Sequence, residues 1–166
     1  MRAGIALGSN LGDRAAHLRT AVEQIIRLPM VRTPLLASSV YETEPVDCAP
    51  DAPKFLNAVI EVECEREPGD LMHRLRRIEE SLGRIGQRAH HEPRVLDLDL
   101  LYLGDTQVDG PSLTLPHPRM LERRFVLEPL AEIRPDLVLP GQTQNVAEFL
   151  VQLPATTPLV RVPCQW

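Results

Sequence analysis

The order of its periodic segments constrains the fold of this chain more than any other feature. Residues 14–28 and 68–82 carry apolar side chains at helical spacing, and each segment lies between stretches with strand character. The expected strands are 3–7, 35–43, 55–65 and 95–103. The resulting order, β-α-β-β-α-β, is typical of a ferredoxin-like α+β sandwich with a mainly antiparallel sheet. We expect the remaining residues to form C-terminal additions, with short helices near 119–127 and 145–153.

Capping and breaking residues mark the ends of the two core helices. Asp13 is a suitable N-cap for the first helix, which must end before Pro29. Pro68 is suited to the first turn of the second helix, and Gly83 to its C-terminal end. The two helices are therefore expected to begin and end close to these residues.

Segment 55–65 alternates between apolar and acidic side chains. Its acidic residues are Glu61, Glu63 and Glu65, and the apolar residues between and before them share the opposite face. Such alternation predicts a half-buried strand, with one face in the core.

Composition places the chain among ordinary globular proteins. Its 166 residues, 43% hydrophobic and 25% charged, suffice for a single domain over 1–166 with a substantial core. A net charge of −5 argues against a general nucleic-acid binder, which has a basic excess. Residues 1–13 lack a signal-peptide pattern, and no apolar run approaches the roughly 20 residues that span a membrane.

The cysteines suggest a compartment for the protein. Cys48, Cys64 and Cys164 are odd in number and widely spaced, and none belongs to a C-x-x-C pair. This usage fits a reducing environment and argues against a structural zinc. We therefore expect a cytoplasmic protein.

Two carboxylates, those of Asp97 and Asp99, interrupt the leucine-rich strand 95–103. Because side chains alternate along a strand, both project from one face, with Cα atoms about 6.6 Å apart. The two cations of a catalytic metal pair lie roughly 3.5–4 Å apart, so this pair can bridge or flank them. Oxygen ligands suit Mg²⁺, which takes the rest of its shell from water and phosphates. The solvent-facing side of an ordinary strand remains the alternative.

Cationic residues flank this strand in the sequence. Those before it are Arg84, Arg88, His90, His91 and Arg94, and those after it are His117, Arg119, Arg123 and Arg124. Arginine forks bind phosphate oxygens, and a metal with arginines commonly stabilises the charge of phosphoryl transfer. The alternative is a solvated loop whose charges pair with glutamates. The carboxylates and cations together favour a phosphate-handling site.

Familiar nucleotide-binding motifs are missing. The turn Gly8-Ser9-Asn10-Leu11-Gly12 follows a strand and precedes a helix, yet it contains neither the Walker A sequence nor G-x-G-x-x-G. Gly8 and Gly12 are interpreted first as turn glycines. If the chain binds a nucleotide, metal and cationic side chains must hold the phosphates.

Asn57 stands out within the apolar run of its strand, where asparagine is disfavoured. Its amide carries donors and an acceptor, which suits the edge of a heterocycle, although an asparagine satisfied by nearby backbone fits equally well. Phe55 and Phe125 are two of only six aromatic residues, and such a pair can enclose a flat ring. Each phenylalanine also fits an ordinary core position.

Considered together, these segments resemble the 6-hydroxymethyl-7,8-dihydropterin pyrophosphokinase family. The matching stretches are IALGSNLGD at 5–13, Y-x-T at 41–43, FLNAV at 55–59, RIEESLGR at 77–84, PRVLDLDLLYLG at 93–104, LPHPRMLERRFVLEPLAEI at 115–133 and PD at 135–136. The resemblance covers nearly the whole chain. It implies the ferredoxin-like fold and the transfer of pyrophosphate from ATP to the pterin hydroxymethyl group, with release of AMP, in tetrahydrofolate biosynthesis.

The resemblance also implies a set of site residues. Asp97 and Asp99 look like ligands of two Mg²⁺ ions, and Arg84 and Arg94 like catalytic loop arginines, to which we add Arg88 as a candidate of our own. The positions similar to ATP contacts are Glu79, Arg84, Arg94, Leu100, Thr114, His117 and Arg123. The positions similar to the pterin pocket are Thr43, Pro45, Val46, Phe55, Asn57 and Phe125, with the ring stacked between the two phenylalanines. Small-molecule substrates and a monomer are expected, with no nucleic acid or membrane partner.

The loop before the aspartates departs from the family pattern. Many members carry R-x-R after the second helix and R-W-G-P-R before the strand, whereas this chain has Gly86, His90, His91 and Glu92 at the altered positions. We hypothesise that Arg88 replaces a missing guanidinium. The two histidines add a pH-sensitive group near neutrality.

Two other functions are weighed against this one. A two-metal nucleotidyltransferase also combines Gly-Ser with D-x-D, but its acidic pair usually follows the Gly-Ser turn closely, whereas here Asp97 is far from Ser9. A pterin- or nucleotide-binding relative without turnover would account for the altered loop but not for the retained carboxylate pair. Formation of AMP from ATP distinguishes all three.

Overall fold

The computed structural model describes residues 1–45, 53–83, 95–155 and 159–164. Its elements are β1 (Arg2–Ser9), α1 (Arg14–Ile26), β2 (Val31–Ala37), β3 (Val40–Thr43), β4 (Phe55–Cys64), α2 (Pro68–Ser81), β5 (Asp97–Leu103), β6 (Val108–Asp109), β7 (Thr114–Leu115), a 3-10 helix (Met120–Glu122), α3 (Arg124–Ile133), α4 (Val146–Gln152) and β8 (Val160–Val162). The element order β1-α1-β2/β3-β4-α2-β5 confirms the predicted core.

The main sheet has the strand order β5-β1-β4-β3-β8, and β2 pairs with β4 beside β3. All of its strand pairs are antiparallel. This arrangement is an α+β ferredoxin-like sheet, as the sequence predicted. A small separate hairpin of β6 and β7 follows β5 in the chain.

One expected strand, 35–43, is divided into β2 and β3 at Ser38 and Ser39. The Ser38 hydroxyl accepts a hydrogen bond from Val59 N at 3.0 Å and donates one to Ser39 O at 2.7 Å. A side chain thus takes the place of a backbone acceptor, and the ladder is interrupted. Strand propensity cannot reveal such a break, because the partner is on β4.

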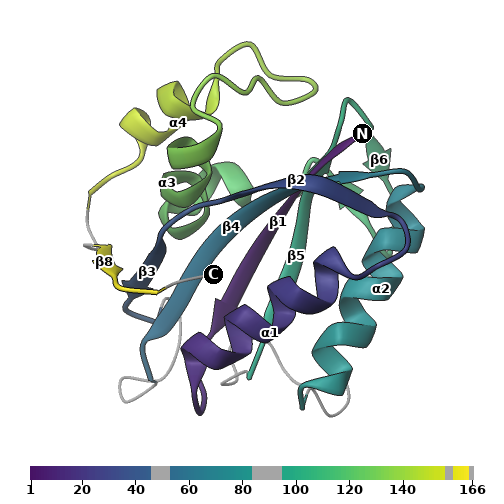
Figure 1. Cartoon of the computed structure of the whole chain (residues 1–166). Helices are drawn as coiled ribbons and strands as arrows, with labels where there is room; N and C mark the ends of the chain where they lie inside the picture. Colours follow the sequence, from purple (N-terminus) through teal and green to yellow (C-terminus); the bar gives the residue numbers. More distant parts are fainter. Residues whose placement is uncertain (46–52, 84–94, 156–158, 165–166) are drawn as a thin grey trace.

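Helices cover both faces of the sheet. Figure 1 shows α1 and α2 grouped on one side, and α3 and α4 grouped apart from them. The first pair buries Leu18, Ile25, Leu71 and Leu75 in a core with alternate residues of β1, β4 and β5. The second core joins α3 and α4 to the opposite faces of β4 and β5. The C-terminal additions therefore form a third layer.

This third layer overturns the half-buried interpretation of β4. Glu63 and Glu65 are exposed, but Glu61 is only 3% exposed. Its carboxylate accepts hydrogen bonds from Arg2, Tyr102 and the residue after α3, Arg134. The three glutamates do alternate with the apolar residues, but their face is covered at Glu61 by an element that follows much later in the chain.

The helix ends confirm the sequence signals. Asp13 Oδ1 accepts a hydrogen bond from Ala16 N at 3.0 Å and caps α1. Pro68 lies in the first turn of α2, and Gly83 follows that helix with φ +110°, a conformation that glycine adopts without strain. None of the helices in the described ranges combines the length and apolar character needed to cross a bilayer.

Candidate active site

One row of residues across the sheet joins the predicted pterin and metal positions. Gly8 of β1 is paired with Asn57 of β4 on one side and with Asp97 of β5 on the other. Residues directly opposite in antiparallel strands project from the same face. A Cβ on Gly8 would lie 3.3 Å from Asn57 Oδ1 and 3.9 Å from Asp97 Cβ. The glycine therefore keeps open the space between an amide and a carboxylate.

The two aspartates lie on this same face. Asp97 and Asp99 are half-buried, whereas Leu98 and Leu100 on the opposite face are 1% and 2% exposed. The predicted alternation is thus present at the start of β5. The face also carries Val59, because Ala6 is paired with Val59 and Asp99.

The alternation changes further along β5. The register with β1 shifts here, because Ile5 is paired with Leu100 and the preceding residue, Gly4, with Tyr102. Leu101 therefore has no partner in β1 and forms a β-bulge. This β-bulge brings Tyr102 to the face of the aspartates. The carbonyl of the bulge residue Leu101 accepts a hydrogen bond from the backbone N–H of His117 at 2.8 Å.

Arg123 and His117 lie close to Asp99. Arg123 Nη1 is 3.8 Å from Asp99 Oδ2, and the Arg123 guanidinium lies 5.6 Å from the centre of the Phe125 ring. Burial lowers the pKa of His117; the charge of Arg123 lowers it too, and Asp99 opposes both only in part. His117 is therefore neutral near pH 7, and its Nδ1 accepts from Arg119 N at 3.3 Å.

Glu79 lies beneath the aspartates, on the α2 side. It is 1% exposed, and its Oε1 accepts a hydrogen bond from Leu98 N at 2.8 Å. The carboxylate thus binds the edge of β5 between Asp97 and Asp99. It fixes the backbone from which both metal candidates project.

Two further ATP candidates lie in β5 and in the β6–β7 hairpin. The Leu100 side chain belongs to the core under α1 and α2, which leaves little of it for a ligand. Thr114 lies in β7 and, with Gln107, Val108 and Leu115, lines an open hollow at the β6–β7 hairpin.

Four of the described pterin candidates lie at the end of β3 and the start of β4, whereas Phe125 lies in the first turn of α3. Asn57 Nδ2 donates to Thr43 Oγ1 at 2.7 Å, and the two residues are 7% and 5% exposed. The partner of this amide is a side chain, and not the loop backbone considered from the sequence. Phe55 is half-buried on the same face, and Pro45 is half-buried just after β3.

Several predicted site residues fall outside the described ranges. These are Val46 of the pterin set and the loop residues Arg84, Gly86, Arg88, His90, His91, Glu92 and Arg94. The described residues contain no group of three or more His, Cys, Asp and Glu side chains that could hold a metal. The carboxylate pair can still suit Mg²⁺, because that ion keeps several waters and takes phosphate oxygens as ligands.

The sequence interpretation missed two acidic residues that hold α3 on the sheet. Besides Glu61, Glu132 accepts hydrogen bonds from Ser39 N and Ser39 Oγ, both at 2.8 Å, and from Tyr41 OH at 3.0 Å. Arg161 of β8 pairs with the same carboxylate at 3.1 Å. No local pattern could have revealed these contacts, because the partners lie far apart in the chain.

The fold and this face of the sheet together indicate a class of protein. Two carboxylates beside an arginine and a histidine, on one face of an α+β sheet, supply the kinds of group that enzymes of phosphate transfer use. The family model described as 7,8-dihydro-6-hydroxymethylpterin-pyrophosphokinase (HPPK) matches residues 4–135. The chain belongs to this family and is a pyrophosphokinase.

Curated relatives agree over most of the chain. The Methylorubrum extorquens protein named 2-amino-4-hydroxy-6-hydroxymethyldihydropteridine pyrophosphokinase is 43% identical over 152 residues, covering 92% of this chain and 93% of that protein. The Bacillus subtilis protein of the same name is 44% identical over 129 residues, covering 78% and 75%. The Schizosaccharomyces pombe folic acid synthesis protein fol1 is 37% identical, and this chain covers 20% of it.

Solved structures support the fold. The Plasmodium falciparum HPPK-DHPS wild-type structure with pteroate matches with a TM-score of 0.69 at 13% identity, covering 91% of this chain and 42% of that one. At this identity the likeness concerns the fold alone. The chain therefore matches one part of larger proteins in some organisms and nearly the whole protein in others.

Proposed function

We propose that residues 1–166 form one pyrophosphokinase domain that transfers pyrophosphate from ATP to 6-hydroxymethyl-7,8-dihydropterin in tetrahydrofolate biosynthesis. The hydroxymethyl oxygen attacks the β-phosphorus and loses its proton, the bond from that phosphorus to the α–β bridging oxygen breaks, and AMP leaves. We further propose that the protein acts as a monomer in the cytoplasm.

The row Asn57–Gly8–Asp97 carries this proposal. A flat ring whose edge is read by Asn57 would lie beside the carboxylate of Asp97, because Gly8 places no side chain between them. The residue proposed to bind the pterin, which receives the pyrophosphate, and the residue proposed to bind the metal and phosphates are then neighbours on one face of the sheet. Holding two reactants in the right geometry is, with electrostatic stabilisation, one of the main contributions that a protein makes to such a transfer.

Asp97 and Asp99 are the proposed ligands of two Mg²⁺ ions. Their half-buried carboxylates share a face and supply the oxygen atoms that Mg²⁺ prefers. When bound, the ions would neutralise the triphosphate and polarise the attacking hydroxyl. The chain contributes the fixed spacing of the two carboxylates, which β5 and the Glu79 contact maintain.

Cationic and polar groups are proposed to hold ATP. Arg123 is near Asp99 and can turn to a phosphate oxygen once that carboxylate has another partner. Neutral His117 can donate from Nε2, since its Nδ1 already accepts a hydrogen bond. The remaining proposed contacts are Glu79, Arg84, Arg94, Leu100 and Thr114.

The pterin is proposed to stack between Phe55 and Phe125, with Asn57 at its edge. Thr43 accepts from the Asn57 amide, which leaves the amide oxygen directed to the space above Gly8. Pro45 and Val46 complete the proposed pocket. Arg84, Arg88 and Arg94 are the proposed loop residues that stabilise the charge of the transition state.

The decisive experiment combines purified protein, ATP, Mg²⁺ and 6-hydroxymethyl-7,8-dihydropterin, and resolves the nucleotides. Pterin-dependent AMP, formed in equal amount with the pterin diphosphate, is the expected result. ADP in place of AMP would contradict the mechanism. Pterin binding without any nucleotide product would instead identify a relative that has lost turnover.

A further inference from the structure

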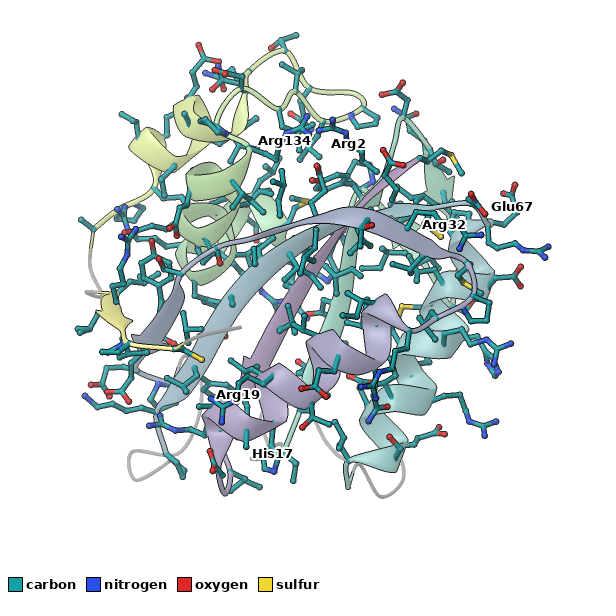
Figure 2. The ribbon with its side chains drawn as sticks, in the orientation of Figure 1. Arg2, His17, Arg19, Arg32, Glu67 and Arg134 are labelled. Carbon is teal, nitrogen blue, oxygen red and sulfur yellow. The ribbon has the colours of Figure 1, made fainter. Side chains whose placement is uncertain are left out.

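A buried carboxylate outside the proposed site joins three elements of the fold. Glu61 Oε1 accepts from Arg134 Nη1 at 2.9 Å and from Arg2 Nη1 at 3.2 Å, and its Oε2 accepts from Tyr102 OH at 2.6 Å. Figure 2 shows Arg2 and Arg134 side by side at the opposite end of the molecule from His17. The Glu61 side chain is 4% exposed. We call these four residues the Glu61 cluster.

The cluster sets the position of β5. Glu61, Gly4 and Tyr102 form one row across β4, β1 and β5. A Cβ on Gly4 would overlap the Tyr102 ring, so glycine is needed for the tyrosine to reach the carboxylate. Tyr102 directly follows the bulge residue Leu101, whose carbonyl holds the backbone of His117.

The cluster also holds one end of α3. Arg134 is the C-cap of α3, while Phe125 lies in the first turn of this helix. At the other end Arg123, the N-cap residue, lies near Asp99. The helix is thus attached to one face of the sheet by a carboxylate at each end.

Substrate binding would affect the contact at Asp99 and the contact at Glu61 differently. Asp99 is a proposed metal ligand, so substrate binding would weaken its pairing with Arg123. Glu61 lies in a different row of the sheet from either aspartate, so substrates at the aspartates need not displace its partners. The contact between Glu61 and Arg134, together with the Glu132 contacts and the core under α3, would then hold the helix when the site is loaded.

We propose that Glu61 is a positioning residue for the reaction, because it aligns β5 through Tyr102 and α3 through Arg134. This alignment places Phe125 and the two aspartates around one substrate-binding space. This inference rests on the proposed function. It assigns no contact with substrate to Glu61.

A purely structural role makes a different prediction. Loss of stability alone would reduce the fraction of folded enzyme, which lowers the apparent kcat and leaves the KM for pterin unchanged. A displaced α3 would raise the KM for pterin in a fully folded protein. Substitutions within such coupled networks change affinity by roughly 2- to 30-fold.

The test compares Glu61→Ala with Glu61→Gln, using Glu63→Ala as the matched control. Glu63 lies two residues along the same strand and face, but is exposed. KM for pterin and kcat are measured at a temperature where circular dichroism shows each variant fully folded. Hydrogen exchange of the α3 backbone amides is measured on the same samples, because it reports on the helix without requiring activity.

We expect Glu61→Ala to raise the KM for pterin roughly 5- to 30-fold and to accelerate exchange throughout α3. Glu61→Gln should recover most of the affinity, since glutamine offers an oxygen to Arg134 and an amide to the Tyr102 hydroxyl. Glu63→Ala should behave as the wild-type protein. If Glu61→Ala does not fold, Arg134→Met, which keeps an apolar stem, should give the same rise in KM.

An unchanged KM for pterin in folded Glu61→Ala, or in folded Arg134→Met, would overturn the proposal. Failure of the proposed function is recognised separately, because the wild-type protein would then form no AMP. In that case the exchange data decide whether Glu61 holds α3, and unchanged exchange in Glu61→Ala would again overturn the positioning role.

Discussion

Arg123 Nη1 lies 3.8 Å from Asp99 Oδ2, with the two side chains 24% and 36% exposed. An ion pair this open to solvent contributes little to stability. Because the pair is weak, the Asp99 carboxylate can leave Arg123 to bind a cation. The Arg123 guanidinium can then bind a phosphate. The pair therefore marks the point where metal and nucleotide are expected to enter.

The first prediction concerns the two aspartates. Asp97→Asn and Asp99→Asn should each lower pterin-dependent AMP formation by roughly 100- to 1,000-fold, because each removes a charged oxygen that a cation would need. Thermal stability should change little, since neither carboxylate is fully buried. Asp105→Asn, at an exposed position, is the control. Retention of more than a tenth of the activity would exclude a metal role for the residue concerned.

The second prediction concerns Asn57. Asn57→Ala should weaken pterin binding roughly 10- to 100-fold, because the ring edge and Thr43 would both lose a buried partner. ATP binding should stay within a factor of two or so. Calorimetric titration of each substrate separately provides the comparison. Equal losses for both substrates would show that Asn57 supports the fold and does not select the pterin.

The third prediction tests the packing at Gly4. Gly4→Ala should lower the free energy of unfolding by about 1–3 kcal/mol, because the added methyl group overlaps the Tyr102 ring. Gly69→Ala is the matched control, since nothing lies within 4 Å of a Cβ there. Denaturant unfolding of both variants is the measurement. Equal stability of the two would show that the Tyr102 ring can move aside.

The fourth prediction concerns pH and Glu132. Burial raises the pKa of Glu132, but hydrogen bonds from Ser39 and Tyr41 outweigh it, and the charge of Arg161 adds to them, so the pKa lies below its usual value. A lowered carboxyl pKa stabilises the fold above the unfolded value of about 4.3, and this contribution is lost as pH falls through the folded pKa.

Glu132→Gln should therefore cost about 1 kcal/mol near neutral pH, or roughly 2–4 °C in Tm, and the difference from the wild-type protein should shrink below about pH 4. Thermal melts across this range test it, with Glu23→Gln as an exposed control. A difference in Tm that stays constant down to pH 3 or so would rule out this titration.

Features whose signals are local could be predicted from the sequence. Asp13 caps α1 and Gly83 ends α2 because the partners of a helix cap lie within one turn. The shared face of Asp97 and Asp99 follows from the two-residue repeat of a strand. The family resemblance supplied the identities of the site residues, which no periodicity could provide.

Features that depend on distant partners could not be predicted. The alternation of β4 correctly separated Glu61 from the apolar residues, but it could not indicate that α3 would cover that face. The division of 35–43 at Ser38 depends on Val59, and the strand β8 exists because it pairs with β3. Each of these contacts joins segments that are remote in the chain.

The sequence by itself determined the order of the core helices and strands, the face on which the aspartates lie, and the family. The tertiary structure decided that both faces of the sheet are covered by helices, where β5 shifts its register, and how Glu61 joins α3 to β5. The physical reason is that periodicity and capping act within a few residues. Burial and the pairing of buried charges are settled only when distant segments pack together.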